Sequence, residues 1–216
     1  KTVISLPLEL RSIYTIMGND GNEDDWIQLS STIFWDNDNR KKFLKERWLP
    51  QKCCWIINQK YFDSLEEKEE LEFKKFLTSN CLFMDFSEQN FFKYCIEEIW
   101  SEVIEHVIDK EISYELLKFL FDNRSALENN YDLSLTKEIP VAINGTNILK
   151  SLKEVNAVIY QPSEDLCILV DEPWMNKNEF TMMEDYYSSL IDGEQAKLYF
   201  AKLGFKVFDK INYVQL

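Results

Sequence analysis

Two short segments far apart in the chain share one pattern, and this internal similarity constrains the fold more than any other feature. Residues 74–83 and 198–207 both read as the end of a helix, a residue that tolerates a left-handed backbone, and an immediate apolar strand. The helix-ending residue is Asn80 in the first segment and Gly204 in the second. We therefore expect two copies of a strand–helix–strand unit, with positive φ at both helix-ending residues.

A second match lies upstream of the first, and a helical region separates the two copies. Tyr-x-x-Ser-Leu occurs at 61–65 and again at 186–190, one residue out of step with the downstream match. From 87 to 110, apolar residues recur at three- and four-residue steps, which is typical of one face of a long helix. A second helix, capped by Ser113, is expected to pack against it. The sequence thus predicts a mixed α/β (α+β) fold in which two strand–helix–strand units flank a central helical hairpin.

The remaining elements follow from hydrophobic periodicity and capping signals. Ser64 and Glu67 form a capping-box pattern at the start of one helix. Short apolar runs bounded by polar residues predict strands, and the run at 53–57 is typical of a strand buried on both faces. The expected strands are 26–35, 53–57, 81–84, 139–143, 157–160, 166–170 and 205–208, and the other expected helices are 38–47, 64–79, 178–191 and 193–203.

The length and composition of the chain favour one ordered domain. Of 216 residues, 45% are hydrophobic, and only five are Gly and five Pro, which leaves little material for a flexible linker. A single compact domain over 1–216 is therefore expected. The alternative is a division into a first α/β unit (1–86), a helical hairpin (87–130) and a second α/β unit (131–216).

The charge of the chain points to one class of partner. There are 24 basic and 38 acidic residues, giving a formal net charge of −14. Such a charge repels nucleic-acid phosphates and anionic membranes at long range. We therefore expect no nucleic acid and no membrane as partner, and favour a protein with a basic surface.

The location expected from the sequence is the cytoplasm. No window approaches the roughly 20 apolar residues that a spanning helix requires, and the first residues lack the apolar core of a signal peptide. The five cysteines are odd in number and lie mostly inside apolar runs, which is typical of free thiols in a reducing compartment.

The usual catalytic and cofactor patterns do not occur in the sequence. Only one histidine, His106, could act as a base for nucleophilic catalysis, and it lies at the edge of an apolar helical stripe. There is no Gly-rich phosphate loop, and adjacent Cys53 and Cys54 do not have zinc-ligand spacing. The acidic run at 20–25 begins like a calcium loop but lacks its Gly and final Glu. We expect no catalytic residue, cofactor or metal, with a carboxylate-based enzyme as the alternative.

Aromatic and apolar residues at predicted turns are the best candidates for partner contacts. Trp174 and Met175 follow Pro173 in a predicted loop, and Trp48 precedes Leu49 and Pro50. Exposed aromatic side chains on loops are typical anchors of protein interfaces. The alternative for each residue is a loop that folds back over the core.

The Trp-Leu-Pro sequence at 48–50, the two helix-to-strand junctions and the segment 133–141 together resemble the non-ATPase repeat regions of sacsin-like giant proteins. These proteins join a GHKL-type ATPase module to long α/β repeats with chaperone-like or scaffold roles. The resemblance covers roughly residues 45–208 and implies a non-catalytic protein-binding or scaffold module of a larger intracellular assembly. A resemblance confined to the residues from Leu6 to Trp26, together with the acidic charge, suggests as an alternative an immunity-type inhibitor of toxins.

Overall fold

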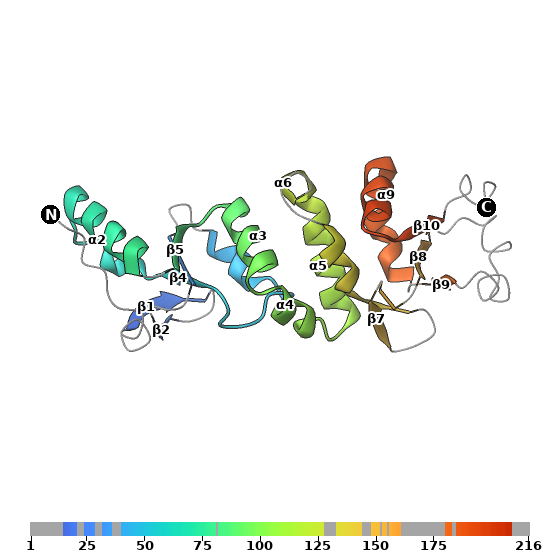
Figure 1. Cartoon of the computed structure of the whole chain (residues 1–216), viewed down its shortest axis with the longest axis horizontal. Coiled ribbons are helices and arrows are strands. Elements are labelled where there is room, and N and C mark those ends of the chain that lie inside the picture. Colours follow the sequence, from blue (N-terminus) through green and yellow to red (C-terminus); the bar gives the residue numbers. More distant parts are fainter. Residues whose placement is uncertain are drawn as a thin grey trace. The chain divides into compact units, whose positions relative to one another are not determined.

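The computed structural model divides the chain into two compact units, residues 1–100 (unit 1) and 101–216 (unit 2). Its fold is mixed α/β, as the sequence predicts, and Figure 1 shows the elements coloured along the chain. The structure describes residues 15–20, 24–28, 32–35, 40–80, 82–127, 133–143, 148–151, 153–154, 156–160, 180–182 and 185–208.

Unit 1 is built on a five-stranded mixed sheet with the strand order β2-β1-β4-β3-β5. β1 is antiparallel to β2 and β4, whereas β3 is parallel to β4 and β5. The expected single strand at 26–35 is therefore wrong, because its two halves pair with different neighbours. The strands are β1 (Thr15–Asn19), β2 (Asp24–Gln28), β3 (Thr32–Trp35), β4 (Trp55–Ile57) and β5 (Leu82–Asp85).

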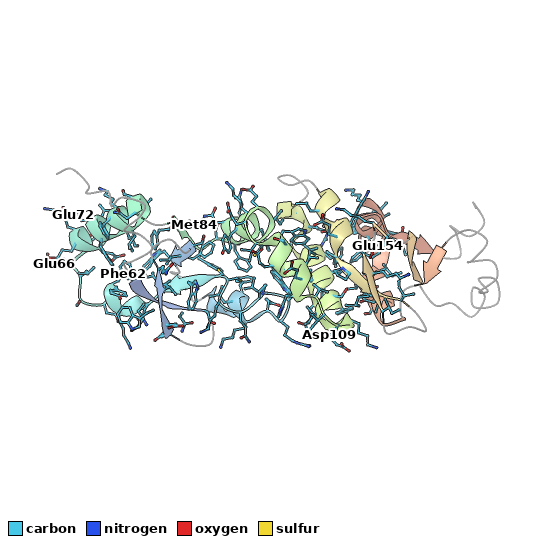
Figure 2. All side chains as sticks on the ribbon, turned by 60° about the horizontal axis from the view of Figure 1, so that its bottom comes forward. Phe62, Glu66, Glu72, Met84, Asp109 and Glu154 are labelled. Atoms are coloured by element: carbon cyan, nitrogen blue, oxygen red, sulfur yellow. The ribbon has the colours of Figure 1, made fainter. Side chains whose placement is uncertain are left out.

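Different helices pack against the two faces of this sheet. Alternate residues of the strands point to one face, where they pack against α2 (Glu67–Asn80) and the 3-10 helix η2 (Gln59–Tyr61). On the other face, the ring of Phe34 lies 5.2 Å from that of Phe86 and 5.7 Å from that of Tyr94 on α3 (Glu88–Glu97). The cluster on the first face contains Ile16, Ile27, Ile33, Trp35, Trp55, Ile57, Leu77 and Phe62, which Figure 2 labels.

The helices of unit 1 differ in detail from the sequence prediction. α2 begins at Glu67, because the Glu69 carboxylate accepts from the Glu66 N–H (3.1 Å) and Ser64 lies outside the cap. The expected helix at 38–47 is a 3-10 helix, η1 (Arg40–Lys45). The expected helix at 87–110 is broken between α3 and α4 (Trp100–His106). The Ile99 N–H bonds the carbonyl of Tyr94, five residues back, so the hydrogen-bond ladder slips at this point.

Unit 2 combines a two-stranded hairpin with a three-stranded parallel sheet. The hairpin joins β6 (Pro140–Ala142) to β7 (Leu149–Ser151), and the sheet has the order β10-β8-β9. The helix expected at 178–191 is replaced by β9 and the 3-10 helix η4. The sheet strands are β8 (Asn156–Tyr160), β9 (Phe180–Met182) and β10 (Lys206–Phe208), and η4 (Asp185–Ile191) and α9 (Gly193–Lys202) precede β10.

The helix α5 (Lys110–Asp122) packs against β6, α6 (Arg124–Leu127) and η4. Its N-cap is Asp109, labelled in Figure 2, whose carboxylate accepts from the Ile112 N–H at 2.8 Å. Ser113, the expected cap, is buried inside the helix and donates to the carbonyl of Pro140 (2.6 Å). A further 3-10 helix, η3 (Leu133–Glu138), leads into β6.

The helix-ending residues behave differently from each other. Gly204 has φ +101°, as expected. Asn80 is the last residue of α2 and does not have positive φ, so that expectation is wrong. Its side chain is buried and donates to the Phe76 carbonyl within the last turn of the helix (2.7 Å).

Candidate functional site

The most exposed large aromatic side chain in the described part of the chain is Trp26, at 61%. It lies on β2, at one edge of the unit 1 sheet. Side chains alternate along a strand, so its neighbour Ile27 enters the core (4% exposed) while Trp26 points to the other face. Across the antiparallel pair, Trp26 lies opposite Met17.

The sheet register shows why Trp26 stays uncovered. Residues opposite each other on neighbouring strands share a face, and the pairs Asn19↔Ile56 and Ile56↔Phe34 place Phe34 on the same face as Trp26. Phe34 is fully buried under Phe86 and the residues of α3. The same face is thus covered over β3, whereas Trp26 is largely exposed at β2.

Two carboxylates precede Trp26, and each is held in place. Asp24 accepts hydrogen bonds from the side-chain amides of Asn19 (2.9 Å) and Asn58 (3.0 Å). Asp25 accepts from Lys52 Nζ (3.2 Å) and from the backbone N–H of Trp26 (2.8 Å). Asp24 lies on the same face of the sheet as the indole and carries a negative charge there, whereas the charge of Asp25 is compensated by Lys52.

The hydrogen bond from Lys52 lowers the pKa of Asp25, and the Trp26 N–H lowers it further. Asp25 is therefore ionised at neutral pH. Lys52 itself has φ +59°, the only positive φ at a non-glycine residue in the described chain. This backbone conformation costs energy for a residue with a side chain. In this conformation Lys52 forms its ion pair with Asp25.

A second group of chemically active side chains lies in unit 1, where Cys53, Cys54 and Cys95 are free thiols. Burial raises the pKa values of Cys54 and Cys95, and thiols nearby raise them further. Burial also raises the pKa of Tyr94, whose hydroxyl donates to the carbonyl of Cys53 (2.5 Å). Protonated, buried thiols are poor nucleophiles and poor metal ligands, so Cys54 and Cys95 are core residues.

Trp48, one of the partner-binding residues expected from the sequence, does not form this site. Trp48 is 1% exposed, with its ring 6.3 Å from that of Phe91, so it offers no open surface to a partner. Trp174 and Met175 lie outside the described residues. Trp26 was missed because the sequence reading placed it at the start of a half-buried strand. No local signal identifies it, because its exposure depends on β2 being an edge strand.

Two further properties of the described residues concern metal binding and membrane insertion. No group of three or more His, Cys, Asp or Glu side chains there has the geometry to hold a metal ion. Among the helices that the structure describes, none has both the length and the apolar character needed to cross a membrane.

Comparison with known proteins found no family model, curated protein or solved structure that matches the chain.

Proposed function

We propose that this chain is a non-catalytic protein-binding or scaffold module whose β1–β2 hairpin contacts a partner with a basic surface. One observation carries the proposal: Trp26 is 61% exposed on an edge strand, directly after two ordered carboxylates. The net charge of −14 supports the same class of partner, since it speeds encounter with a basic surface.

The hairpin offers three kinds of contact. The indole of Trp26 provides a flat apolar surface and attracts a cation to its face. Asp24 adds negative charge on the same face as the ring. The outer edge of β2 provides backbone groups that an extended peptide can pair with. A lysine or arginine from the partner would lie over the ring and near a carboxylate.

The same arrangement already occurs inside unit 1. The ammonium group of Lys74 lies 4.0 Å from the centroid of the Trp35 ring and 2.8 Å from a carboxylate oxygen of Glu70. This contact joins an indole, a carboxylate and a cation within one fold. At Trp26 the indole and the carboxylates are present, and the cation would come from the partner.

The proposal includes an arrangement of two strand–helix–strand units and a role in a larger assembly. Two strand–helix–strand units on either side of a helical region suit a scaffold, and the resemblance to sacsin-like repeat regions implies the same role in a larger assembly. The free thiols Cys53, Cys54 and Cys95 support a reducing, cytoplasmic location.

The decisive experiment is affinity capture from a lysate of the source cell with wild-type chain and with Trp26→Ala. We expect the variant to lose the partner, and the wild-type interaction to weaken as salt rises. Leu198→Ala is the matched control, because Leu198 is similarly exposed (64%) but lies on α9 of unit 2. A partner retained equally by Trp26→Ala, or tight binding of DNA or RNA at about 0.15 M ionic strength, would contradict the proposal.

A further inference from the structure

The hairpins of the two units pair in the same register. Three pairs of β1 with β2 are Ile16↔Ile27, Met17↔Trp26 and Gly18↔Asp25. Adding 124 to each number gives the three pairs of β6 with β7: Pro140↔Ser151, Val141↔Lys150 and Ala142↔Leu149. The two similar segments of the sequence, 74–83 and 198–207, are displaced by the same 124 positions.

The elements after each hairpin also correspond. β3 in unit 1 and β8 in unit 2 each lie between two parallel strands, β4 and β5 in one case and β9 and β10 in the other. In both units a 3-10 helix and an α-helix connect the outer two strands. β3 begins at Thr32 and β8 at Asn156, while β5 begins at Leu82 and β10 at Lys206, so both starts differ by 124.

The inward-facing residues of the helices align with a displacement of 123, one residue out of step with the strands. Those of α9 and its C-cap are Ala196, Tyr199, Phe200 and Leu203, all buried. The corresponding residues of α2 are Phe73 and Phe76, which are partly buried, and Leu77 and Asn80, which are buried. Asn80 therefore corresponds to Leu203 rather than to Gly204, which accounts for its helical backbone. A tyrosine hydroxyl also accepts from the hairpin in each unit: Tyr61 from the Met17 N–H and Tyr187 from the Ala142 N–H, both at 3.1 Å.

From these correspondences we infer that the two units are copies of one repeat, and that unit 1 keeps open a helix-docking face on α2 that α5 occupies in unit 2. The inference does not depend on the Trp26 surface. It concerns the face of α2 that carries Phe76 and Glu72.

In unit 2, the C-terminal end of α5 lies on α9. The hydroxyl of Tyr199 donates to the carbonyl of Leu120 (3.1 Å), and the Phe121 ring stacks on that of Phe200 at 5.8 Å. Arg124, just after α5, donates to the side chain of Gln195 (3.1 Å). Under this cover Tyr199 is 1% exposed and Phe200 is fully buried.

The corresponding residues of unit 1 are more open. Tyr199 corresponds to Phe76, which is only half-buried, and Gln195 corresponds to Glu72, which is exposed and labelled in Figure 2. An aromatic residue that is fully covered in one copy is thus partly uncovered in the other. The neutral amide that receives Arg124 in unit 2 is a carboxylate in unit 1.

The change from Gln195 in unit 2 to Glu72 in unit 1 indicates which kind of helix would dock on α2. The partner is an amphipathic helix with an aromatic or aliphatic residue in the place of Phe121 and an arginine or lysine in the place of Arg124. A cation there would form an ion pair with the Glu72 carboxylate, whereas in unit 2 the charged guanidinium of Arg124 donates to a neutral amide. The charge of the chain favours such a basic helix.

A peptide copied from the chain itself tests this site. The probe is a fluorescently labelled peptide of residues 110–127, which spans α5, Asn123 and α6, and the measurement is its anisotropy during titration with the full chain. We expect saturable binding that Glu72→Arg weakens by roughly five- to tenfold, because the change replaces attraction by repulsion. A peptide carrying Arg124→Glu should recover that loss on the Glu72→Arg chain.

Two controls separate this site from others. Glu67→Arg makes the same charge change at an exposed residue on a different side of α2 and should leave the affinity unchanged. Trp26→Ala should also leave it unchanged, so failure here and failure of the proposed function are distinguishable. No saturable binding, or binding that Glu72→Arg and Glu67→Arg affect equally, overturns the inference. The second result would mean that the peptide responds to the overall charge of the chain and not to this face of α2.

Discussion

Removal of one buried hydroxyl tests the packing of unit 2. The Tyr187 hydroxyl accepts from the Ala142 N–H (3.1 Å), and both residues are buried, at 0% and 4% exposure. Tyr187→Phe keeps the ring and leaves a buried N–H without this acceptor. An unsatisfied buried donor costs about 1–3 kcal/mol. We expect unit 2 to lose stability in that range.

Unit 1 supplies a matched comparison. Tyr61 accepts from the Met17 N–H at the same distance, but this bond is only partly buried, so water can replace the lost hydroxyl. Tyr61→Phe should therefore cost about 0.5–1.5 kcal/mol, the net value of an ordinary hydrogen bond. Tyr114→Phe, which removes an exposed contact to Ser189, should cost less than either.

Native-state hydrogen exchange read by mass spectrometry reports the opening free energy of each unit separately. Peptides covering β6 should exchange faster in Tyr187→Phe, and peptides covering β1 should change only in Tyr61→Phe. Equal effects of Tyr187→Phe and Tyr114→Phe would refute the reasoning, because burial would then not decide the cost.

Two further predictions concern thiols and a glycine. The pKa values of Cys54, Cys95 and Tyr94 are raised in the folded state, so folding favours their protonated forms. The resulting contribution to the stability of unit 1 is fully present below the ordinary pKa values of about 8.5 for a thiol and 10 for tyrosine. Unit 1 loses that stability as pH rises above them, so urea midpoints should fall in alkali; midpoints that stay constant to pH 11 would contradict this. Gly204→Val should destabilise unit 2 by about 1–3 kcal/mol in urea titrations, because φ is +101° and a β-branched residue resists that region. Gly193→Ala, at another positive φ with open space around it, provides a comparison. An unchanged urea midpoint in Gly204→Val would show that the backbone can relax.

The sequence predicts the mixed α/β class of the fold better than it predicts the individual helices. The registers of the two hairpins differ by 124 positions, the displacement that also separates the similar segments 74–83 and 198–207. The break after α3 was missed because Ile99 and Val103 continue the apolar periodicity across it (8% and 0% exposed). Periodicity reports which residues are buried, and it does not report a slip in the hydrogen-bond ladder. Ser113 was misread for a similar reason, since its hydroxyl bonds Pro140, far away in the sequence.

The candidate surface could not be predicted from local patterns. Whether Trp26 is exposed depends on β2 being an edge strand and on α3 covering only part of the face, and both are tertiary facts. Trp48 shows the converse. It occupies a predicted turn, yet Phe91 and other core residues cover it.

The two proposed surfaces require the same feature in a partner, and the chain's own contacts explain why. Lys74 lies over the Trp35 ring beside Glu70, and the guanidinium of Arg124 lies 4.3 Å from the centroid of the Phe121 ring. Each contact combines an aromatic face with a cation. Trp26 with Asp24, and Phe76 with Glu72, are the aromatic and acidic side chains of the two proposed surfaces. Binding at either surface should therefore weaken with salt, because part of the attraction is between exposed charges.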